Sequence, residues 1–193
     1  YVAAKLALGY ALTEIPNGIT RRTTAFFEPA LDYLVCKFPR WDLGKFYGAS
    51  TRIGTEMKSV GEVMAIGRTF PEVIQKAVRM LDIGVRGLDP GAFRFDDLRD
   101  ELRNATPLRI FAVAQAIRDG ISIDEIHQLT QIDCWFLHAI EPIVEMYGRL
   151  AYSTLPLAAD VLRIVKRLGF SDQAIGKLVG AAEESIRARS GLT

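Results

Sequence analysis

The stretch that decides the fold reads Met57-Lys58-Ser59-Val60-Gly61-Glu62-Val63-Met64-Ala65-Ile66-Gly67-Arg68-Thr69. Its apolar residues follow neither a helical face nor a strict alternation. The β-branched residues favour a strand, and Gly61 and Gly67 mark places where the backbone turns or another segment comes close. Lys58 and Glu62 put charges into an apolar run, which costs free energy unless they are paired or used. We therefore expect either structural pairing or a functional role for these two charges.

The residues before this stretch predict a mixture of helix and strand. Residues 1–10 carry a helical stripe of apolar side chains. A β-rich run over 33–38 predicts a strand that ends at Pro39. Residues 53–57 and 61–67 indicate two more strands, or one strand that is interrupted by a bend.

A helix start follows the stretch directly. Thr69-Phe70-Pro71-Glu72 forms a capping box, in which the Thr69 hydroxyl accepts an N–H of the first turn and Glu72 reaches back to the Thr69 amide. The next apolar residues are spaced to pack on the strands; they are Val73, Ile74, Ala77, Val78 and Leu81. Glycines and a proline in 82–95 break this pattern and indicate a domain connection. The expected fold class is an α+β segment over 1–82 followed by an all-α domain over 83–193.

The second half of the chain shows helix start and stop signals at regular intervals and no strand pattern. Pro107 and Gly120 are expected to bound one helix. Ser122 opens another capping box. Asp133 can cap a long helix, in which Pro142 removes one backbone hydrogen bond, so we expect a kink or a break there.

Two segments of this half resemble helix-turn-helix units. Each begins at a serine, Ser122 or Ser171, and continues as a short helix, a tight turn and a second helix. A DNA-reading role needs basic residues that neutralise phosphates, whereas Glu183-Glu184 opens the second candidate reading helix. The sequence favours packing units of a helical domain and leaves a nucleic-acid-binding module as the alternative function.

Composition excludes several classes of protein. The 193 residues are 49% hydrophobic and 24% charged with a net charge of +1, so the chain lacks the strong basic footprint of a nucleic-acid binder. No apolar run approaches the roughly 20 residues of a membrane span. We expect a cytoplasmic protein with no membrane or nucleic-acid partner. Cys36 and Cys134 lie far apart and are expected to be reduced.

The residue types needed for catalysis are sparse. Cys134 and His138 are four residues apart on a predicted helix, with His127 as a distant third ligand, but zinc sites need three or four convergent ligands. Neither histidine lies beside a nucleophile and an orienting acid. Residues 61–67 lack the G-x-x-x-x-G-K-[ST] pattern that cradles phosphates. We expect no catalytic, cofactor-binding or metal-ligating residue in this chain.

Longer motifs carry a family resemblance. They are Tyr1-Val2-Ala3-Ala4-Lys5-Leu6-Ala7-Leu8-Gly9, Phe27-Glu28-Pro29-Ala30-Leu31-Asp32-Tyr33, Lys37-Phe38-Pro39-Arg40-Trp41-Asp42, the 57–69 stretch and Leu129-Thr130-Gln131-Ile132-Asp133-Cys134-Trp135-Phe136-Leu137. Together they closely resemble the large synthetase chain of carbamoyl-phosphate synthase, from the end of its first ATP-grasp half onward. One position departs from the family pattern: many relatives place Gly-Gly where this chain has Arg21-Arg22.

The resemblance implies that 1–82 is the C-terminal part of the ATP-grasp carboxyphosphate domain and 83–193 the helical oligomerisation domain. The implied parent is an ATP-dependent carbon–nitrogen ligase of pyrimidine or arginine biosynthesis. It makes carbamoyl phosphate from bicarbonate, two ATP and ammonia that a glutaminase subunit or domain releases from glutamine. The implied cofactors of the parent are ATP, Mg²⁺ or Mn²⁺, and K⁺. The family's metal ligands and phosphate loop precede the matching part, so this chain alone is expected to be inactive.

The resemblance also marks structural signature positions, which are Glu28, Pro29, Asp32, Lys58, Ser59, Gly61, Glu62, Met64 and Gly67. The mixed charges of Lys37 and Arg40 are expected to be solvated or paired. The expected role of the chain itself is to join the two synthetase halves and to support a homo-oligomer. An apolar surface around Trp135, Phe136 and Leu150 is the expected interface.

Overall fold

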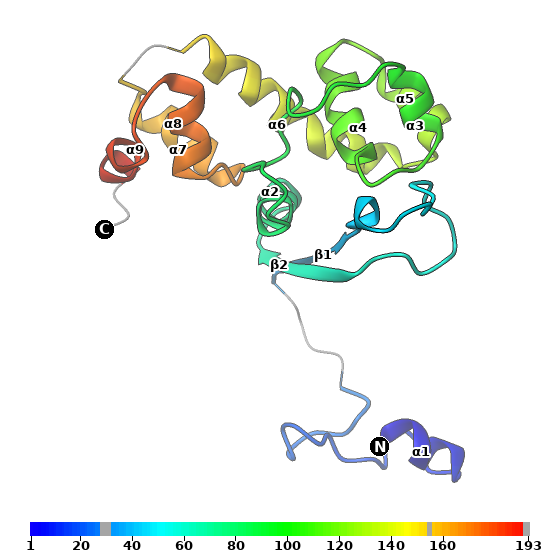
Figure 1. The fold of residues 1–193 in the computed structure, drawn as a ribbon. Helices are drawn as coiled ribbons and strands as arrows, with labels where there is room; N and C mark the ends of the chain where they lie inside the picture. Colours follow the sequence, from blue (N-terminus) through cyan, green and yellow to red (C-terminus); the bar gives the residue numbers. More distant parts are fainter. Residues whose placement is uncertain (28–31, 154–155, 191–193) are drawn as a thin grey trace. The chain divides into compact units, whose positions relative to one another are not determined.

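A computed structural model of the chain describes residues 1–27, 32–153 and 156–190. Glu28 and Pro29 of the predicted signature lie outside these residues. The chain divides into two compact units, Tyr1–Asp32 and Tyr33–Thr193. The larger unit is mostly helical with one small antiparallel sheet (Figure 1).

The N-terminal unit has little core of its own. Helix α1 (Val2–Ala7) buries no residue, and Ile15 is the one buried apolar side chain described in the unit. A loop is closed by the N–H of Ala25, which donates to the carbonyl of Ile15 at 2.6 Å. Arg21 has a φ of 53°, a left-handed value that glycine adopts more readily. This strained position lies where the family resemblance predicts glycine.

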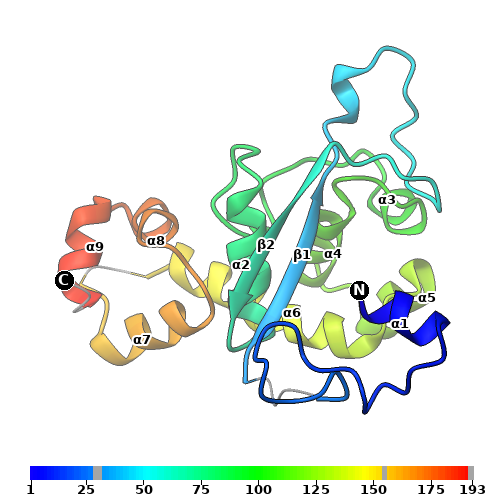
Figure 2. The ribbon, with the colours of Figure 1, turned by 90° about the horizontal axis from the view of Figure 1, so that it is seen from below.

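A β-hairpin opens the larger unit. Strands β1 (Leu34–Arg40) and β2 (Gly61–Gly67) pair antiparallel, with Cys36 opposite Ala65 and Phe38 opposite Val63. Cys36 and Phe38 pack against the hydrophobic core, and Ala65 is fully buried. Helix α2 (Phe70–Met80) packs against both strands (Figure 2). One face of the hairpin is therefore covered by α2.

Two predictions about the strands are wrong. Strand β1 continues through Pro39, which pairs with Glu62. A two-stranded sheet consists of edge strands, where the missing proline N–H costs no ladder hydrogen bond. Residues 53–57 form no strand, because the N–H of Ile53 donates to the carbonyl of Ala105 at 2.6 Å. The connection over 41–60 extends beyond the end of the hairpin and holds the short 3-10 turn η1 (Leu43–Lys45) (Figure 2).

The predicted cap of α2 is confirmed with one change. The Thr69 hydroxyl accepts the N–H of Glu72 at 3.4 Å, and the Glu72 carboxylate accepts the N–H of Arg68 at 2.8 Å rather than that of Thr69. The predicted apolar face of α2 is buried. The helix also packs on α6 (Cys134–Ala151), so it lies between the hairpin and the helices.

Two arginine side chains connect α2 and the hairpin to neighbouring segments through hydrogen bonds to backbone carbonyls. Arg40 of β1 donates to the carbonyl of Leu81 at 2.6 Å, just after α2 ends. Arg79 of α2 donates to the carbonyl of Gly169 at 3.2 Å. Burial lowers the pKa of Arg79 below its ordinary value, but an arginine remains charged at neutral pH. Helix α2 thereby connects the hairpin to the C-terminal helices.

The segment between α2 and α3 (Leu98–Arg103) has no helix or strand, as predicted for the connection at 82–95. It is nevertheless well packed. Leu88 is fully buried, and its N–H donates to Oε1 of Gln75 at 2.7 Å. The larger compact unit continues across 82/83, and a domain boundary at that position stays a prediction.

Helices α3, α4 (Arg109–Arg118) and α5 (Ile123–Thr130) form one group with α6. Three predicted signals are confirmed: Gly120 follows α4 with a φ of 82°, Ser122 accepts the N–H of Glu125, and Asp133 accepts the N–H of Trp135. The predicted start at Pro107 is wrong by two residues, because α4 begins at Arg109. Helix α6 runs without a break through Pro142, so a break there is wrong. Ile140 and Ile143 on either side are buried, and this packing holds the two halves of the helix together.

The remaining helices are α7 (Ala159–Arg167), α8 (Asp172–Val179) and α9 (Glu183–Ser190). They lie toward the other end of α6 from α3–α5 (Figure 1). Ser171 caps α8 by accepting the N–H of Ala174, and Gly180 ends it with a φ of 69°. The predicted order of helix, short connection and helix is therefore present in both segments, at α5–α6 and at α8–α9. None of the described helices has the length and apolar character needed to cross a membrane.

Candidate functional site

The outer face of the hairpin exposes apolar side chains. Val35 pairs with Ile66 and Lys37 with Met64 across the strands, and the strand alternation turns these residues away from α2. Val35, Met64 and Ile66 are 50%, 57% and 44% exposed. We call these three residues the hairpin face. A contiguous exposed apolar face of this kind is typical of a surface that another segment or chain covers.

Charges beside the hairpin face are paired. Lys37 Nζ lies 2.7 Å from Glu62 Oε1, with both side chains more than half exposed, so the pair contributes at most about 1 kcal/mol. Lys58 Nζ donates to the carbonyl of Arg52 at 2.9 Å and lies 3.4 Å from a carboxylate oxygen of Glu56. The structural alternative predicted for Lys58 and Glu62 is thus present in the structure.

The other signature residues differ in how tightly they are packed. A Cβ added at Gly67 would lie 2.7 Å from Cγ1 of Val73, so α2 approaches the strand closely there, whereas Gly61 has nothing within 4 Å. Ser59 is half-buried, and Asp32 is exposed at the end of the N-terminal unit. Gly67 is therefore the signature glycine that packing requires.

An aromatic cluster forms a second exposed surface. Phe70 at the start of α2 has its ring centroid 5.6 Å from that of Trp135 and 5.5 Å from that of Phe136. Trp135 and Phe136 are 59% and 44% exposed. The prediction that grouped Leu150 with these two residues is wrong, because Leu150 is fully buried in the helical core.

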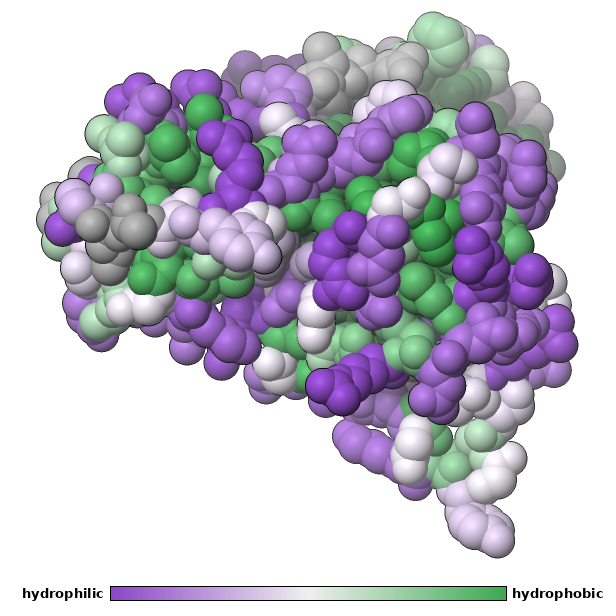
Figure 3. Space-filling model, turned by 90° about the horizontal axis from the view of Figure 1, so that it is seen from above, coloured by the Kyte–Doolittle hydropathy of each residue, from purple (hydrophilic) through white to green (hydrophobic). Residues whose placement is uncertain are grey.

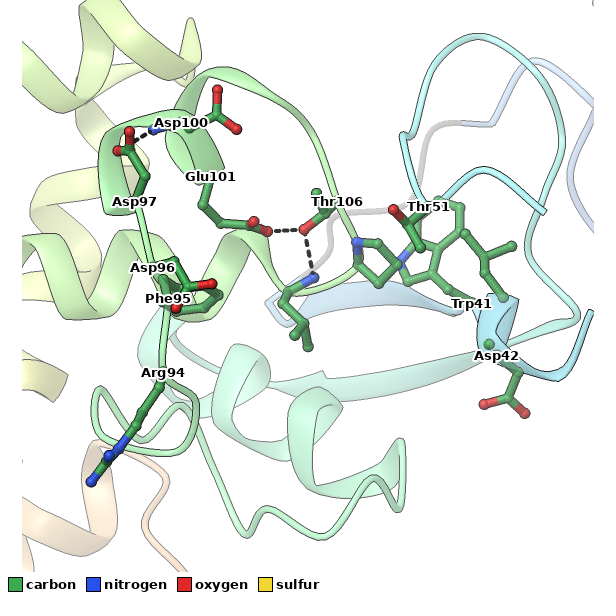
Figure 4. A pocket seen from close by; sticks show the side chains of 14 residues that line it. Trp41, Asp42, Thr51, Arg94, Phe95, Asp96, Asp97, Asp100, Glu101 and Thr106 are labelled. Carbon is green, nitrogen blue, oxygen red and sulfur yellow. Dashed lines mark hydrogen bonds between the residues drawn. The ribbon is translucent and has the colours of Figure 1, made fainter. Parts of the chain in front are cut away.

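A cavity with a volume of about 620 Å³ lies between the 41–51 loop and the start of α3 (Figure 4). It is rich in acidic residues, but most of them have structural partners. Asp42 pairs with Lys45 and Arg40, which hold its pKa below the ordinary value. Asp97 caps α3, and the Glu101 carboxylate accepts the hydroxyl of Thr106. Most of the acidic residues of this cavity therefore hold its loops in place.

Metal-ligand chemistry finds no support in the described part of the chain. It contains no group of three or more His, Cys, Asp or Glu residues that could hold an ion. His138 Nδ1 lies 2.6 Å from Glu141 Oε2, and His127 Nδ1 lies 2.7 Å from the carbonyl of Ile132. Cys36 and Cys134 are free thiols, and burial raises the pKa of Cys36.

A hairpin with an uncovered apolar face, a connecting helix and two groups of helices along α6 define a mostly helical domain. The chain belongs to the family of the carbamoyl-phosphate synthetase large chain, oligomerisation domain, whose model matches residues 62–191.

Curated relatives match almost the whole chain. It is 50% identical to the arginine-specific, mitochondrial carbamoyl phosphate synthase large chain of Schizosaccharomyces pombe over 98% of this chain. It is 49% identical to the carbamoyl phosphate synthase large chain of Methanothermobacter thermautotrophicus and 48% identical to the multifunctional protein pyr1-3 of Dictyostelium discoideum, each over 97% of this chain. The chain spans 16%, 17% and 8% of the length of these three proteins, respectively.

Proposed function

We propose that the chain is a non-catalytic assembly module of a carbamoyl-phosphate synthase. Its hairpin and N-terminal unit belong to the C-terminal end of the first ATP-grasp domain, and its helical part joins the two synthetase halves. The hairpin face carries this proposal: Val35, Met64 and Ile66 are apolar and about half exposed on a sheet of two strands. The opposite face of the hairpin is packed on α2, so this exposed apolar face is the one that another part of the parent would cover.

The N-terminal unit supports the same proposal. A segment with one buried apolar side chain among its described residues lacks the core that a stable unit of this size needs. Tyr1, Leu8, Ile19 and Phe26 are all strongly exposed. These side chains would be buried against the remainder of the ATP-grasp domain.

Family membership is the basis on which we propose an activity for the parent protein. The parent is an ATP-dependent ligase that forms carbamoyl phosphate from bicarbonate, two ATP and glutamine-derived ammonia. It would use Mg²⁺ or Mn²⁺ and K⁺, together with a glutaminase subunit or domain. Cytoplasmic localisation and a place in pyrimidine or arginine biosynthesis also remain proposals. The acidic residues of the large cavity have structural roles, and this agrees with a catalytic centre in another part of the parent.

Self-association is the second part of the proposed function. Trp135 and Phe136 offer exposed aromatic surface beside Phe70, and aromatic residues are enriched in the centres of protein interfaces. Apolar patches between hydrophilic side chains also occur on the helical face in Figure 3. Such a surface suits an interface between copies of the chain.

The nucleic-acid-binding alternative gains no support from the helices. Both segments have the helix, short connection and helix order, but α9 begins with Glu183 and Glu184, which would repel phosphates. A basic residue near α9 is also engaged in an ion pair, because Lys166 Nζ lies 3.0 Å from Asp172 Oδ1.

The coding sequence on both sides of this chain tests the ATP-grasp assignment. We expect an upstream Glu-x-Asn metal motif and a glycine-rich phosphate loop, because the residues described here contain neither a phosphate loop nor metal ligands. A second ATP-grasp half is expected downstream. An unrelated domain fused upstream of the hairpin would contradict the proposal, because the rest of the ATP-grasp domain would then not be present to cover the hairpin face.

A further inference from the structure

We propose that a small protonated oxyanion, such as hydrogenphosphate, binds in a cavity formed by the 84–92 segment, α6 and α8. The cavity has a volume of about 160 Å³, and its polar lining comes from Arg86, Asp89, Tyr147 and Lys177. At about 30 Å³ per water in the liquid, it has room for an ion of about five heavy atoms. An outer hollow of about 470 Å³ shares Gly84, Arg86 and Lys177 with it.

The buried phenol of Tyr147 supplies a donor without a partner. Tyr147 is 6% exposed, and its hydroxyl makes no hydrogen bond with any described residue. Burial, and to a smaller extent the charge of Asp89, raises the pKa of Tyr147 far above its ordinary value, so the phenol keeps its proton. The hydroxyl is not among the fully buried unpartnered atoms of the described residues, and Tyr147 lines the cavity. An acceptor oxygen in the cavity would give this donor a hydrogen-bond partner.

A second unpartnered donor lies at the same corner. Within the described residues, Nε2 of Gln75 is buried and has no hydrogen-bond partner, while Oε1 of this amide accepts the N–H of Leu88. A Cβ added at Gly87 would lie 2.3 Å from Gln75 Oε1 and 3.0 Å from the Tyr147 hydroxyl. Gly87 therefore lets both groups approach one point of the backbone, and this corner has more donors than acceptors.

The charges at the cavity fit an oxyanion that still carries a proton. Arg86 and Lys177 are exposed at its rim, and neither forms an ion pair with a described residue. Asp89 would repel a fully deprotonated anion. One of its oxygens accepts the N–H of Gly91 at 2.8 Å, which leaves the other to accept the P–OH of hydrogenphosphate. Sulfate has no such proton at neutral pH, so the site should discriminate between the two ions.

Calorimetric titration of the whole chain with inorganic phosphate, at neutral pH and constant ionic strength, tests the proposal. Saturable binding is expected, with much weaker binding of sulfate. Lys177→Gln and Arg86→Gln should each weaken phosphate binding by about tenfold or more, since each removes a charge-assisted hydrogen bond. Tyr147→Phe should weaken it by about threefold or more. Arg103→Gln, an exposed arginine of α3 outside the cavity, should change nothing.

Further variants decide the specificity and control for folding. Asp89→Asn should bring the affinities for phosphate and sulfate together. Tyr147→Phe removes only an unpartnered hydroxyl, so its thermal melting should match the wild type. A parallel titration with glycerol phosphate identifies the form of the ligand. Tighter binding than that of inorganic phosphate would indicate a phosphate ester that extends into the outer hollow. Weaker binding would indicate the free ion. Absent phosphate binding, equal sulfate binding by the wild type, or binding unaffected by Lys177→Gln would overturn the proposal.

Discussion

Replacing Gly169 with alanine is expected to destabilise the chain by about 2–5 kcal/mol. Gly169 has a φ of 87°, a left-handed value that costs an alanine about 1–2 kcal/mol. The new Cβ would also lie 2.9 Å from Cα of Glu72 and 3.0 Å from Cβ of Gln75. Crowding of this kind costs about 1–3 kcal/mol. Backbone atoms of α2 cannot move away cheaply, because α2 is packed between the hairpin and α6.

Gly120→Ala provides the matched control for this variant. Gly120 has a similar φ of 82°, and nothing lies within 4 Å of an added Cβ. It should cost only the conformational term of about 1–2 kcal/mol. Urea unfolding of both variants gives the difference directly. Equal losses would mean that the turn after α7 does not pack on α2 as described.

Truncation of Leu137 to alanine is expected to cost about 2–5 kcal/mol. Leu137 is fully buried on α6, so the variant loses apolar burial and leaves a cavity in the helical core. Trp135→Ala, two residues earlier on the same helix, removes a side chain that is mostly exposed. Its ring contacts with Phe70 and Phe136 are worth at most about 1.5 kcal/mol each.

Thermal and urea unfolding of the two variants distinguish the core of α6 from its surface. A larger loss for Leu137→Ala agrees with an exposed aromatic cluster. If Trp135→Ala destabilised the chain as much as Leu137→Ala, the cluster would belong to the core and would not be available to a partner.

Local contacts could be predicted from sequence. The caps at Thr69, Ser122 and Asp133 join atoms two or three residues apart, so the residue types and their spacing define them. The bonds that fix α2 could not be predicted in this way. Arg79 binds the carbonyl of Gly169, which is 90 residues away, and Arg40 binds that of Leu81, which is 41 residues away.

The errors at the sites have similar causes. Residues 53–57 have strand-like composition, but a strand needs a partner, and Ile53 instead bonds to Ala105 in a loop. Leu150 lies seven residues after Ile143, which places both on the same face of α6 after two turns, and both are fully buried. Trp135 and Phe136 lie in the first turn of the helix, where the core does not cover them. Helical periodicity alone would group Phe136 with Ile143 and Leu150, because they are spaced seven residues apart, so the burial of Leu150 depends on packing that the sequence pattern does not show.

The central claim, that the chain is an assembly module with an exposed aromatic interface, is tested most directly by sedimentation equilibrium from micromolar to millimolar concentration. The wild type is expected to self-associate as its concentration rises. The double variant Trp135→Ser, Phe136→Ser should remain monomeric and folded, whereas Tyr47→Ser, at a fully exposed position in the 41–60 connection, should behave as the wild type does. A wild-type chain that stays monomeric throughout, or an association that the double variant does not weaken, would contradict the account.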